Sequence, residues 1–417
     1  MHYFKYKGKT LFCENISVAK LMDKYGTPLF IYSQKTILDH FNKLKKAFSS
    51  IDALICYSVK VNSNICILNL LTKKGSGLDI VSGGELFLAK QVGCPGKKIV
   101  YASVGKTDKE IKDAINYEIL MFNVESIPEL KRMNRIARQL KKKPKVALRF
   151  NPNVDAKTHK YITTGKKENK FGMDEETVKK LILNNQDYSY LDIVGLHMHI
   201  GSQITQSSPY INAIKNAARL INFLKKQGIA LKYLNIGGGL GIIYDKEKPQ
   251  TAKAFAKKVL PLLKKLKLKI ILEPGRFIVG NAGILASKVT YVKETRTKKF
   301  IIVDAAMNDL LRPSLYGAYH NIMPVVKSAN NKQKSIKKAD VVGPICESGD
   351  FLGKDRLINV EESEGIAVFA AGAYAFSMSS NYNSRPRAAE VLVRGSRDYL
   401  IRKRETYKDL INKEIIV

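Results

Sequence analysis

The sequence predicts an α/β protein consisting of a (β/α)8 barrel and a separate, mostly antiparallel β domain. Eight β-rich runs alternate with helical patterns up to residue 272, and short β runs separated by turns follow residue 285. The length of 417 residues suits a barrel of roughly 250 residues plus a smaller domain. We expect the barrel to span residues 36–285, and a β-rich domain of residues 1–35 and 286–417 to contribute to the functional site.

The predicted barrel strands are short runs rich in apolar and β-branched residues. They are Leu54–Lys60, Leu78–Val81, Lys98–Ala102, Ile119–Phe122, Val146–Phe150, Ile193–Ile200, Tyr233–Ile236 and Leu268–Leu272. Apolar residues spaced near 3.6 predict helices between them, including Gly84–Gln91, Glu125–Leu140, Tyr210–Lys226 and Ala252–Lys265. Ser126 and Asp108 stand near helix starts, and Gly75, Gly93 and Gly228 follow helix ends.

The second domain is predicted from short β runs at both ends of the chain. These runs are Tyr3–Phe12, Leu29–Tyr32, Ser287–Tyr291, Phe300–Asp304, Ala339–Val342, Gly365–Ala370 and Glu390–Val393. The longest interruption of the barrel pattern, Asn151–Tyr190, is predicted to lie over one mouth of the barrel. Its first part, Asn151–Lys170, is our candidate for a loop that closes over the site.

Composition separates several classes of protein. The net charge of +34 could indicate a nucleic-acid or membrane partner, but the lysines are scattered over almost every predicted helix without interleaved aromatic residues. No run approaches the roughly 18 apolar residues of a membrane helix, and no secretory signal is visible. Five cysteines without a CxxC pair indicate reduced thiols. We therefore expect a cytoplasmic protein with neither nucleic acid nor membrane as partner.

Residues that packing does not require cluster at the carboxyl ends of the predicted strands. In a barrel, these ends meet at one mouth, where catalytic groups collect. They are Lys60, Asp79, Arg149, His199, Ser202, Gly237, Gly238, Gly239, Glu273, Gly275 and Arg276. The strands therefore predict a single site at that mouth, with a phosphate near the seventh and eighth strands.

Each of these residues also has a structural explanation. Lys60 in a dry pocket would be a good nucleophile, although a lysine at a strand end commonly extends into solvent. The glycines could leave backbone N–H groups bare for an anion or could only form a tight turn. Glu273 could face the pyridine nitrogen of a cofactor and keep it protonated, or it could only form a salt bridge with Arg276 at the rim of the barrel.

Two further features suggest specific chemistry. His197 and His199 alternate on one strand and should point the same way. No other metal-binding residues accompany them, so we expect no metal. The flat imidazole of His199 is instead expected to stack on the ring of a cofactor. Cys346 adjoins Glu347 and lies near Asp350, whose charges disfavour a thiolate. A protonated thiol suits an acid better than a nucleophile.

Motifs in a consistent order across nearly the whole chain resemble the diaminopimelate decarboxylases. They are Tyr-Ser-Val-Lys-Val-Asn at 57–62, Asp-Ile-Val-Ser-Gly-Gly-Glu at 79–85, Gly-Leu-His-Met-His-Ile-Gly-Ser-Gln at 195–203, Gly-Gly-Gly-Leu-Gly at 237–241, Glu-Pro-Gly-Arg at 273–276, Arg-Pro-Ser-Leu-Tyr-Gly-Ala-Tyr-His at 312–320, Cys-Glu-Ser-Gly-Asp at 346–350 and Gly-Ala-Tyr at 372–374. One departure is Val61, where the family usually has alanine.

The resemblance implies an alanine-racemase-like fold, a homodimer and pyridoxal 5'-phosphate (PLP) as cofactor. Lys60 would carry the Schiff base, His199 would stack on the ring, and Cys346 would protonate the α-carbon from the partner subunit. The cofactor site would comprise Lys60, Asp79, His199, Ser202, Gly237, Gly238, Gly239, Glu273, Gly275, Arg276 and Tyr374. The substrate site would comprise Arg276, Arg312, Tyr316, Glu347 and Tyr374.

The implied reaction is decarboxylation of meso-2,6-diaminopimelate to L-lysine and CO2, the last step of lysine biosynthesis. Arginine forks onto a distal carboxylate that ornithine and lysine do not offer at that end. The alternatives are a decarboxylase of the same fold acting on ornithine, arginine or carboxynorspermidine, a racemase, an inactive regulatory homologue, and a basic nucleic-acid binder. Retention of Lys60, Glu273 and Cys346 together argues against the inactive homologue.

Overall fold

The computed structural model describes residues 2–155, 171–327 and 338–417 and divides into two compact units. The barrel unit comprises Phe41–Ile242 and Lys248–Phe277. The β unit comprises the chain up to His40, the short segment Ile243–Glu247, and Ile278–Val417. Part of the predicted closing loop, residues 156–170, lies outside the described residues.

Eight parallel strands close the barrel in chain order, and this confirms the predicted fold class. The strands are β5 (Ala53–Ser58), β6 (Gly77–Ile80), β7 (Ile99–Tyr101), β8 (Met121–Val124), β9 (Lys145–Arg149), β10 (Asp192–His197), β11 (Tyr233–Asn235) and β12 (Lys269–Leu272). Pairing of Leu54 with Ile271 joins the first strand to the last. Cys56, Val100 and Ala147 belong to the buried apolar cluster of these strands, so the barrel is packed rather than open.

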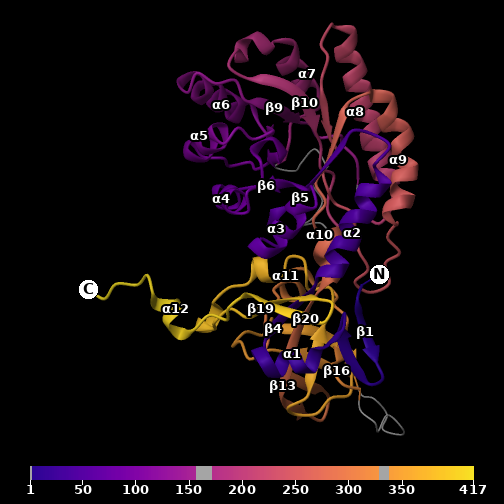
Figure 1. Cartoon of the computed structure of the whole chain (residues 1–417), viewed down its shortest axis with the longest axis vertical. Helices are drawn as coiled ribbons and strands as arrows, with labels where there is room; N and C mark the ends of the chain where they lie inside the picture. The colour runs from indigo at the N-terminus through magenta and orange to yellow at the C-terminus, as the bar shows by residue number, and fades with distance from the viewer. Residues whose placement is uncertain (1, 156–170, 328–337) are drawn as a thin grey trace. The chain divides into compact units, whose positions relative to one another are not determined.

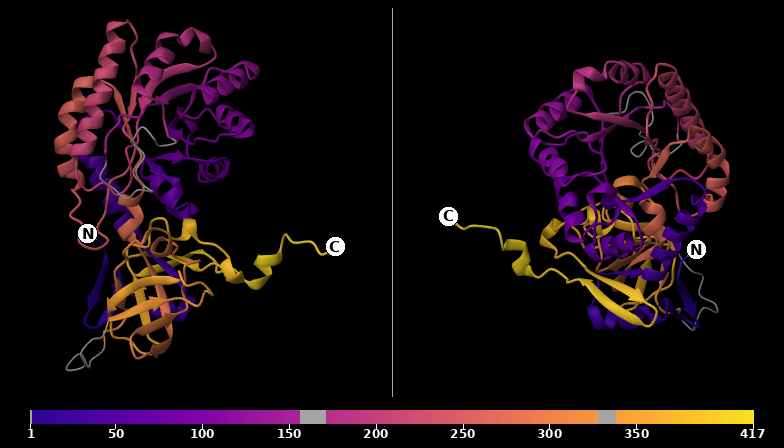
Figure 2. Two further views of the ribbon diagram at one scale, coloured as in Figure 1. Left: turned by 180° about the vertical axis from the view of Figure 1, so that it is seen from behind. Right: turned by 45° about the horizontal axis from the view of Figure 1, so that its top comes forward.

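The helices surround the barrel strands as a ring (Figure 2, right). They are α3 (Ile65–Lys73), α4 (Gly83–Gln91), α5 (Asp108–Asn116), α6 (Ile127–Gln139), α7 (Glu175–Leu183), α8 (Ser208–Lys226) and α9 (Ala252–Leu266). The Ser126 side chain caps α6, and Thr107 rather than Asp108 caps α5. Gly75, Gly93 and Gly228 follow helix ends with positive φ, as predicted.

The β unit contains a mixed sheet in the order β17-β16-β14-β13-β4-β19-β20, with β15 and β18 off this path, and a small sheet β1-β2-β3. Its strands are β1 (Phe4–Lys7), β2 (Thr10–Cys13), β3 (Ile16–Ser17), β4 (Leu29–Ser33), β13 (Gly283–Glu294), β14 (Lys299–Val303), β15 (Ile322–Pro324), β16 (Lys338–Val342), β17 (Phe351–Leu357), β18 (Gly365–Val368), β19 (Ala389–Arg394) and β20 (Arg397–Arg402). Two pairs, β14–β16 and β4–β19, are parallel, so the sheet is mostly antiparallel as expected.

Two details of the predicted β unit are wrong. Tyr3–Phe12 is not one strand, because Gly8 turns the chain at φ +57° and makes β1 and β2 an antiparallel hairpin. The strands β3, β15, β17 and β20 were not predicted. The remaining helices are α1 (Val18–Tyr25), α2 (Gln34–Ala47), α10 (Arg276–Val279), α11 (Arg312–Tyr316) and α12 (Tyr407–Ile411) (Figure 1). None of the helices in the described ranges is long and apolar enough to cross a membrane.

Candidate active site

Lys60 lies just beyond the end of β5 in a short 3-10 turn, Val59–Val61. Its Nζ donates to Asp79 Oδ2 over 2.6 Å, and Ser58 Oγ donates to the same oxygen over 2.7 Å. Burial and the nearby Glu273 raise the pKa of Asp79, although Lys60 opposes the rise. The Lys60 side chain is 37% exposed and paired with a carboxylate, so the expected dry pocket is wrong.

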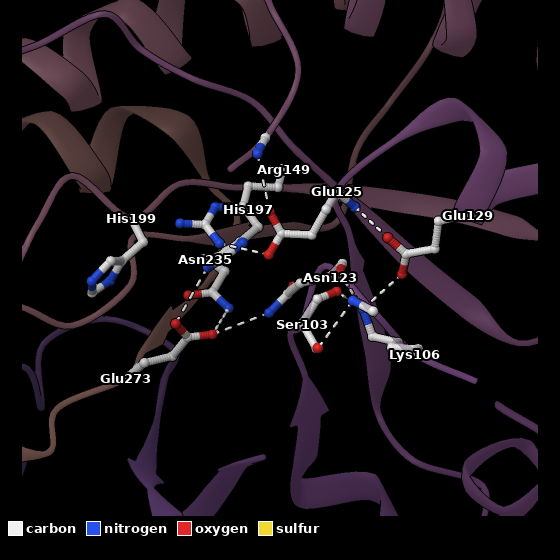
Figure 3. A network of polar contacts seen from close by, with 12 residues as sticks. Ser103, Lys106, Asn123, Glu125, Glu129, Arg149, His197, His199, Asn235 and Glu273 are labelled. Atoms are coloured by element: carbon white, nitrogen blue, oxygen red, sulfur yellow. Dashed lines mark hydrogen bonds and ion pairs between the residues drawn. The ribbon is translucent and has the colours of Figure 1, made fainter. Parts of the chain in front are cut away.

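Glu273 follows β12 and is buried among side chains from three other strands (Figure 3). Its Oε1 accepts hydrogen bonds from Asn123 Nδ2 (3.1 Å) and Asn235 Nδ2 (2.6 Å). Its Oε2 lies 3.3 Å from His197 Nε2. Burial alone would raise the pKa of Glu273, but His197 and Lys60 outweigh it and the pKa is lowered. Glu273 is therefore an ionised carboxylate within the barrel mouth and not a residue of the rim.

The two histidines of β10 have different partners. The strand ends at His197, so strand alternation does not extend to His199. His199 Nδ1 accepts the backbone N–H of Gly238 over 3.2 Å, whereas His197 contacts Glu273. Burial, followed by the charge of Arg149, lowers the pKa of His199 to about 3. His199 is thus a neutral imidazole at physiological pH.

The glycine turn after β11 requires glycine for structural reasons. A Cβ on Gly238 or Gly239 would collide with the backbone carbonyls of Glu273 and Gly201. Gly237 N–H donates to Asn235 Oδ1, and Gly238 N–H donates to His199. The expectation that these two N–H groups are bare is therefore wrong, because the protein itself uses them.

Two other predicted residues of the barrel unit lie close together. Arg276 Nη2 donates to Ser202 Oγ over 3.1 Å, so the loops after β10 and β12 meet there. Gly275 packs so closely on Val61 and Ser58 that a Cβ would collide with the Val61 side chain. Val61, the departure from the family pattern, thus packs against Gly275, one of the glycines predicted to lie near the phosphate.

Arg149 was expected at the barrel mouth, but the buried charged network to which it belongs, beside Glu273, was not predicted (Figure 3). Lys106 Nζ donates to Glu129 Oε1 (2.7 Å) and to the carbonyl of Asn123 (2.9 Å). Arg149 Nη1 donates to Glu125 Oε1 over 2.6 Å. The available signal was position, since Asn123 and Arg149 lie at the ends of β8 and β9 and Glu125 follows β8.

The remaining predicted residues lie in the β unit. Arg312 begins α11 and is buried, and Tyr316 ends that helix. Cys346 is an exposed thiol, whereas Cys13, Cys56 and Cys94 are buried. Ser314 Oγ donates to the carbonyl of Gly349 over 2.6 Å, which ties α11 to the Cys346–Asp350 loop. This loop also carries Glu347. Tyr374, the last of the predicted residues in the β unit, lies outside the loop and has φ +55°.

Asp350 holds that loop in shape. Its carboxylate accepts the N–H groups of Met307 (2.7 Å) and Ile345 (2.8 Å). Burial raises the pKa of Asp350. Its role is thus to fix the backbone beside Cys346. Among the described ranges, no group of three or more His, Cys, Asp or Glu side chains is arranged to hold a metal ion.

The residues at the barrel mouth fit PLP. They supply an amine on Lys60, an ionised buried carboxylate on Glu273 and the neutral ring of His199. Asn123 Oδ1 is buried without a hydrogen-bond partner among the described residues, which is consistent with a polar site. PLP is a pyridine ring that bears an aldehyde. It requires an amine to bind the aldehyde, a carboxylate to face the ring nitrogen and a flat group to stack on the ring, and Lys60, Glu273 and His199 provide them.

Comparison with known proteins identifies the class. Residues 34–280 match the family described as "Pyridoxal-dependent decarboxylase, pyridoxal binding domain". The chain is 51% identical to diaminopimelate decarboxylase of Aquifex aeolicus (strain VF5), over 99% of this chain and 97% of that protein. It is 45% identical to the Vibrio cholerae enzyme of that name, over 98% of each. The structure of diaminopimelate decarboxylase from Helicobacter pylori complexed with L-lysine matches with a TM-score of 0.91 and 42% identity, over 95% of this chain and 98% of that one.

The chain is therefore a pyridoxal-dependent decarboxylase, a carboxy-lyase with PLP as its cofactor. Within that class it belongs to the diaminopimelate decarboxylase family. The resemblance predicted from the motifs is confirmed.

Proposed function

We propose that the chain removes CO2 from meso-2,6-diaminopimelate and releases L-lysine, the last step of lysine biosynthesis. The observation that carries the cofactor chemistry of this proposal is the ionised Glu273, held by two amides and His197 at the mouth that also presents Lys60. The substrate is inferred from Arg312, a buried cation for a distal carboxylate. PLP, when bound, supplies the electron sink for the departing carboxylate. The protein's own groups then orient the substrate and move protons.

Each candidate site residue of the barrel unit has a proposed role toward the cofactor. Lys60 attaches the cofactor, and Asp79 aims its amine. Glu273 keeps a proton on the ring nitrogen, and the neutral His199 stacks on the ring. The phosphate is held by the turn that contains Gly237, Gly238 and Gly239, by Ser202, Gly275 and Arg276 of the same unit, and by Tyr374 of the β unit. Because Gly237 and Gly238 already donate within the chain, Gly239 is the glycine of that turn we expect to contact phosphate.

The β unit supplies the acid and, apart from Arg276 of the barrel unit, the proposed substrate contacts. Arg312 and Arg276 bind the distal carboxylate, Glu347 accepts from the distal ammonium, and Tyr316 and Tyr374 complete the grip. Cys346 donates a proton to the α-carbon from the partner subunit of a cytoplasmic homodimer. Its exposed thiol is consistent with a role across a subunit interface. The proposed domains are residues 36–285 and residues 1–35 with 286–417; they differ from the two compact units near residues 36–40 and 278–285 and in assigning Ile243–Glu247 to the barrel.

Charge favours this substrate over other diamino acids. Ornithine has no distal carboxylate, so the ion pair proposed for Arg312 could not form with it. A carboxylate offers an arginine a bidentate, charge-assisted contact that a distal ammonium cannot offer. A related decarboxylase would instead need an acidic or neutral residue at this position.

The decisive experiment is an absorbance spectrum of the purified protein followed by addition of meso-diaminopimelate. We expect a cofactor band, a borohydride-stable mass increase on the Lys60 peptide, and equal amounts of CO2 and L-lysine. A cofactor band without L-lysine would exclude this substrate and direct the assay to ornithine, arginine and carboxynorspermidine. Absence of any band after addition of PLP would overturn the assignment of Lys60.

A further inference from the structure

Arg312 is held from two sides within the β unit. Its guanidinium carbon lies 4.5 Å from the centre of the Tyr244 ring, and its Nη1 lies 2.7 Å from His320 Nε2. The rings of Tyr244 and His320 meet edge to face at 5.2 Å. All three side chains are buried, His320 completely. The three residues therefore form one packed cluster around a charge.

The second ring nitrogen of His320 determines its protonation state. His320 Nδ1 lies 2.8 Å from the backbone carbonyl oxygen of Phe369, which can only accept a hydrogen bond. Nδ1 must therefore carry the hydrogen. Nε2 is then left with a lone pair, and this lone pair accepts from Arg312. A doubly protonated ring would turn one N–H toward the guanidinium, so the arrangement requires neutral His320.

The backbone around the cluster is also restrained. Gly317 ends α11 in the left-handed region at φ +60°, and this turn brings His320 back to Arg312. The N–H of Phe369 donates to the carbonyl of Asn321 over 2.8 Å. The acceptor that sets the His320 tautomer is thus anchored next to His320 itself.

We propose that His320 is a positioning residue for Arg312, which it aims at the distal carboxylate of the substrate. The inference rests on the proposed role of Arg312. A guanidinium has five N–H donors in a rigid fork, so fixing one nitrogen on His320 and one face on Tyr244 fixes the direction of the rest. His320 itself does not contact the substrate in this proposal.

Two substitutions separate positioning from packing. His320→Asn places an amide where Nδ1 was, so it can donate to Phe369 but cannot reach Arg312. His320→Gln places an amide where Nε2 was, so its oxygen can still accept from Arg312. The probes are L-lysine, which has the carboxylate that Arg312 would bind, and 1,5-diaminopentane, the same chain without it. Binding to the PLP-loaded protein is measured by calorimetry.

We expect His320→Asn to weaken L-lysine binding about tenfold, the loss typical of a hydrogen bond to a charged group, and to leave 1,5-diaminopentane binding within about twofold. His320→Gln should retain L-lysine binding within about threefold of the unsubstituted protein. Equal weakening of both ligands, or equal effects of both substitutions, would reduce His320 to a packing residue and overturn the inference.

Arg312→Ala distinguishes this inference from the proposed function. If Arg312→Ala weakens L-lysine binding and His320→Asn does not, the positioning role fails and the role of Arg312 stands. If Arg312→Ala leaves L-lysine binding unchanged, the proposed role of Arg312 fails, and the inference fails with it. In the double variant, His320→Asn should add no further loss, because it acts only through Arg312.

Discussion

Lys60 Nζ lies 2.6 Å from Asp79 Oδ2, and this pair joins a partly exposed amine to a completely buried carboxylate. Asp79 also accepts from Ser58, so its position is set by the end of β5. The amine proposed to attach the cofactor is thus oriented by a charge, although the sequence suggested that desolvation would activate it. Lys60 would then have two separable roles, attachment of the cofactor and pairing with Asp79.

Lys60→Arg and Lys60→Ala should separate these roles. Arginine keeps a cation beside Asp79 but cannot attach PLP, so borohydride-fixed cofactor and turnover should both disappear while the fold is retained. Alanine should lose the same activities and also unfold at a lower temperature, because Asp79 would be buried without its counter-charge. Thermal unfolding of both variants provides the comparison. Equal unfolding temperatures would show that the pair contributes nothing to stability.

Glu273→Gln tests the proposed ring-nitrogen contact. Glutamine Oε1 can still accept from Asn123 and Asn235, so the site should stay assembled. Loss of the negative charge should lower kcat about 10²–10³-fold, as removal of one preorganised electrostatic group does elsewhere. The control is borohydride-fixed PLP, which should remain near one per chain. Unchanged kcat would remove Glu273 from the chemistry.

Cys346→Ala should lower kcat about 10²–10⁴-fold if the thiol is the acid that protonates the product. Cofactor content should be unaffected, because the proposed attachment is on Lys60. Retention of full activity would exclude Cys346 as that acid.

Mixing the inactive Cys346→Ala and Lys60→Ala proteins tests the shared site. In a symmetric dimer with sites built across the interface, random exchange should restore about a quarter of the original activity. The mixture is unfolded, refolded together and assayed for L-lysine, with each protein refolded alone as control. Activity no greater than that of the separate proteins would place Lys60 and Cys346 of each working site on one subunit.

Asp309 should make stability depend on pH. This carboxyl of the β unit is buried, and burial raises its pKa to about 7, although it accepts the N–H of Ala306. Because the folded pKa lies above the unfolded value of about 3.9, the group's full stability is present below about pH 4 and is lost as the pH rises through 7.

The variant Asp309→Asn keeps an acceptor for Ala306 and cannot titrate. Between pH 5 and pH 8, the free energy of unfolding of the unsubstituted protein should fall by roughly 2–3 kcal/mol relative to that of the variant. Urea unfolding of both proteins at the two pH values measures this difference. A difference that does not change with pH would show that Asp309 is charged throughout the range.

Much of the fold could be predicted because it depends on local pattern. All eight barrel strands were expected at nearly the observed places, and Ser126 caps its helix as its residue type suggests. Hydrophobic periodicity and capping are properties of a few adjacent residues, so the sequence alone can predict the elements that depend on them. The hairpin at Gly8 was missed, since two short strands and one longer strand have similar composition.

The partners of the functional residues were decided only by the closed barrel and the packed β unit. Asn123 and Glu273 are 150 residues apart and meet because β8 and β12 end at the same mouth. Likewise, Gly237 and Gly238 direct their N–H groups to side chains of their own barrel. A hydrogen bond is short and directional, so its existence depends on positions that no local pattern encodes. The sequence by itself thus determined which residues are available for chemistry, and the tertiary structure determined what each of them faces.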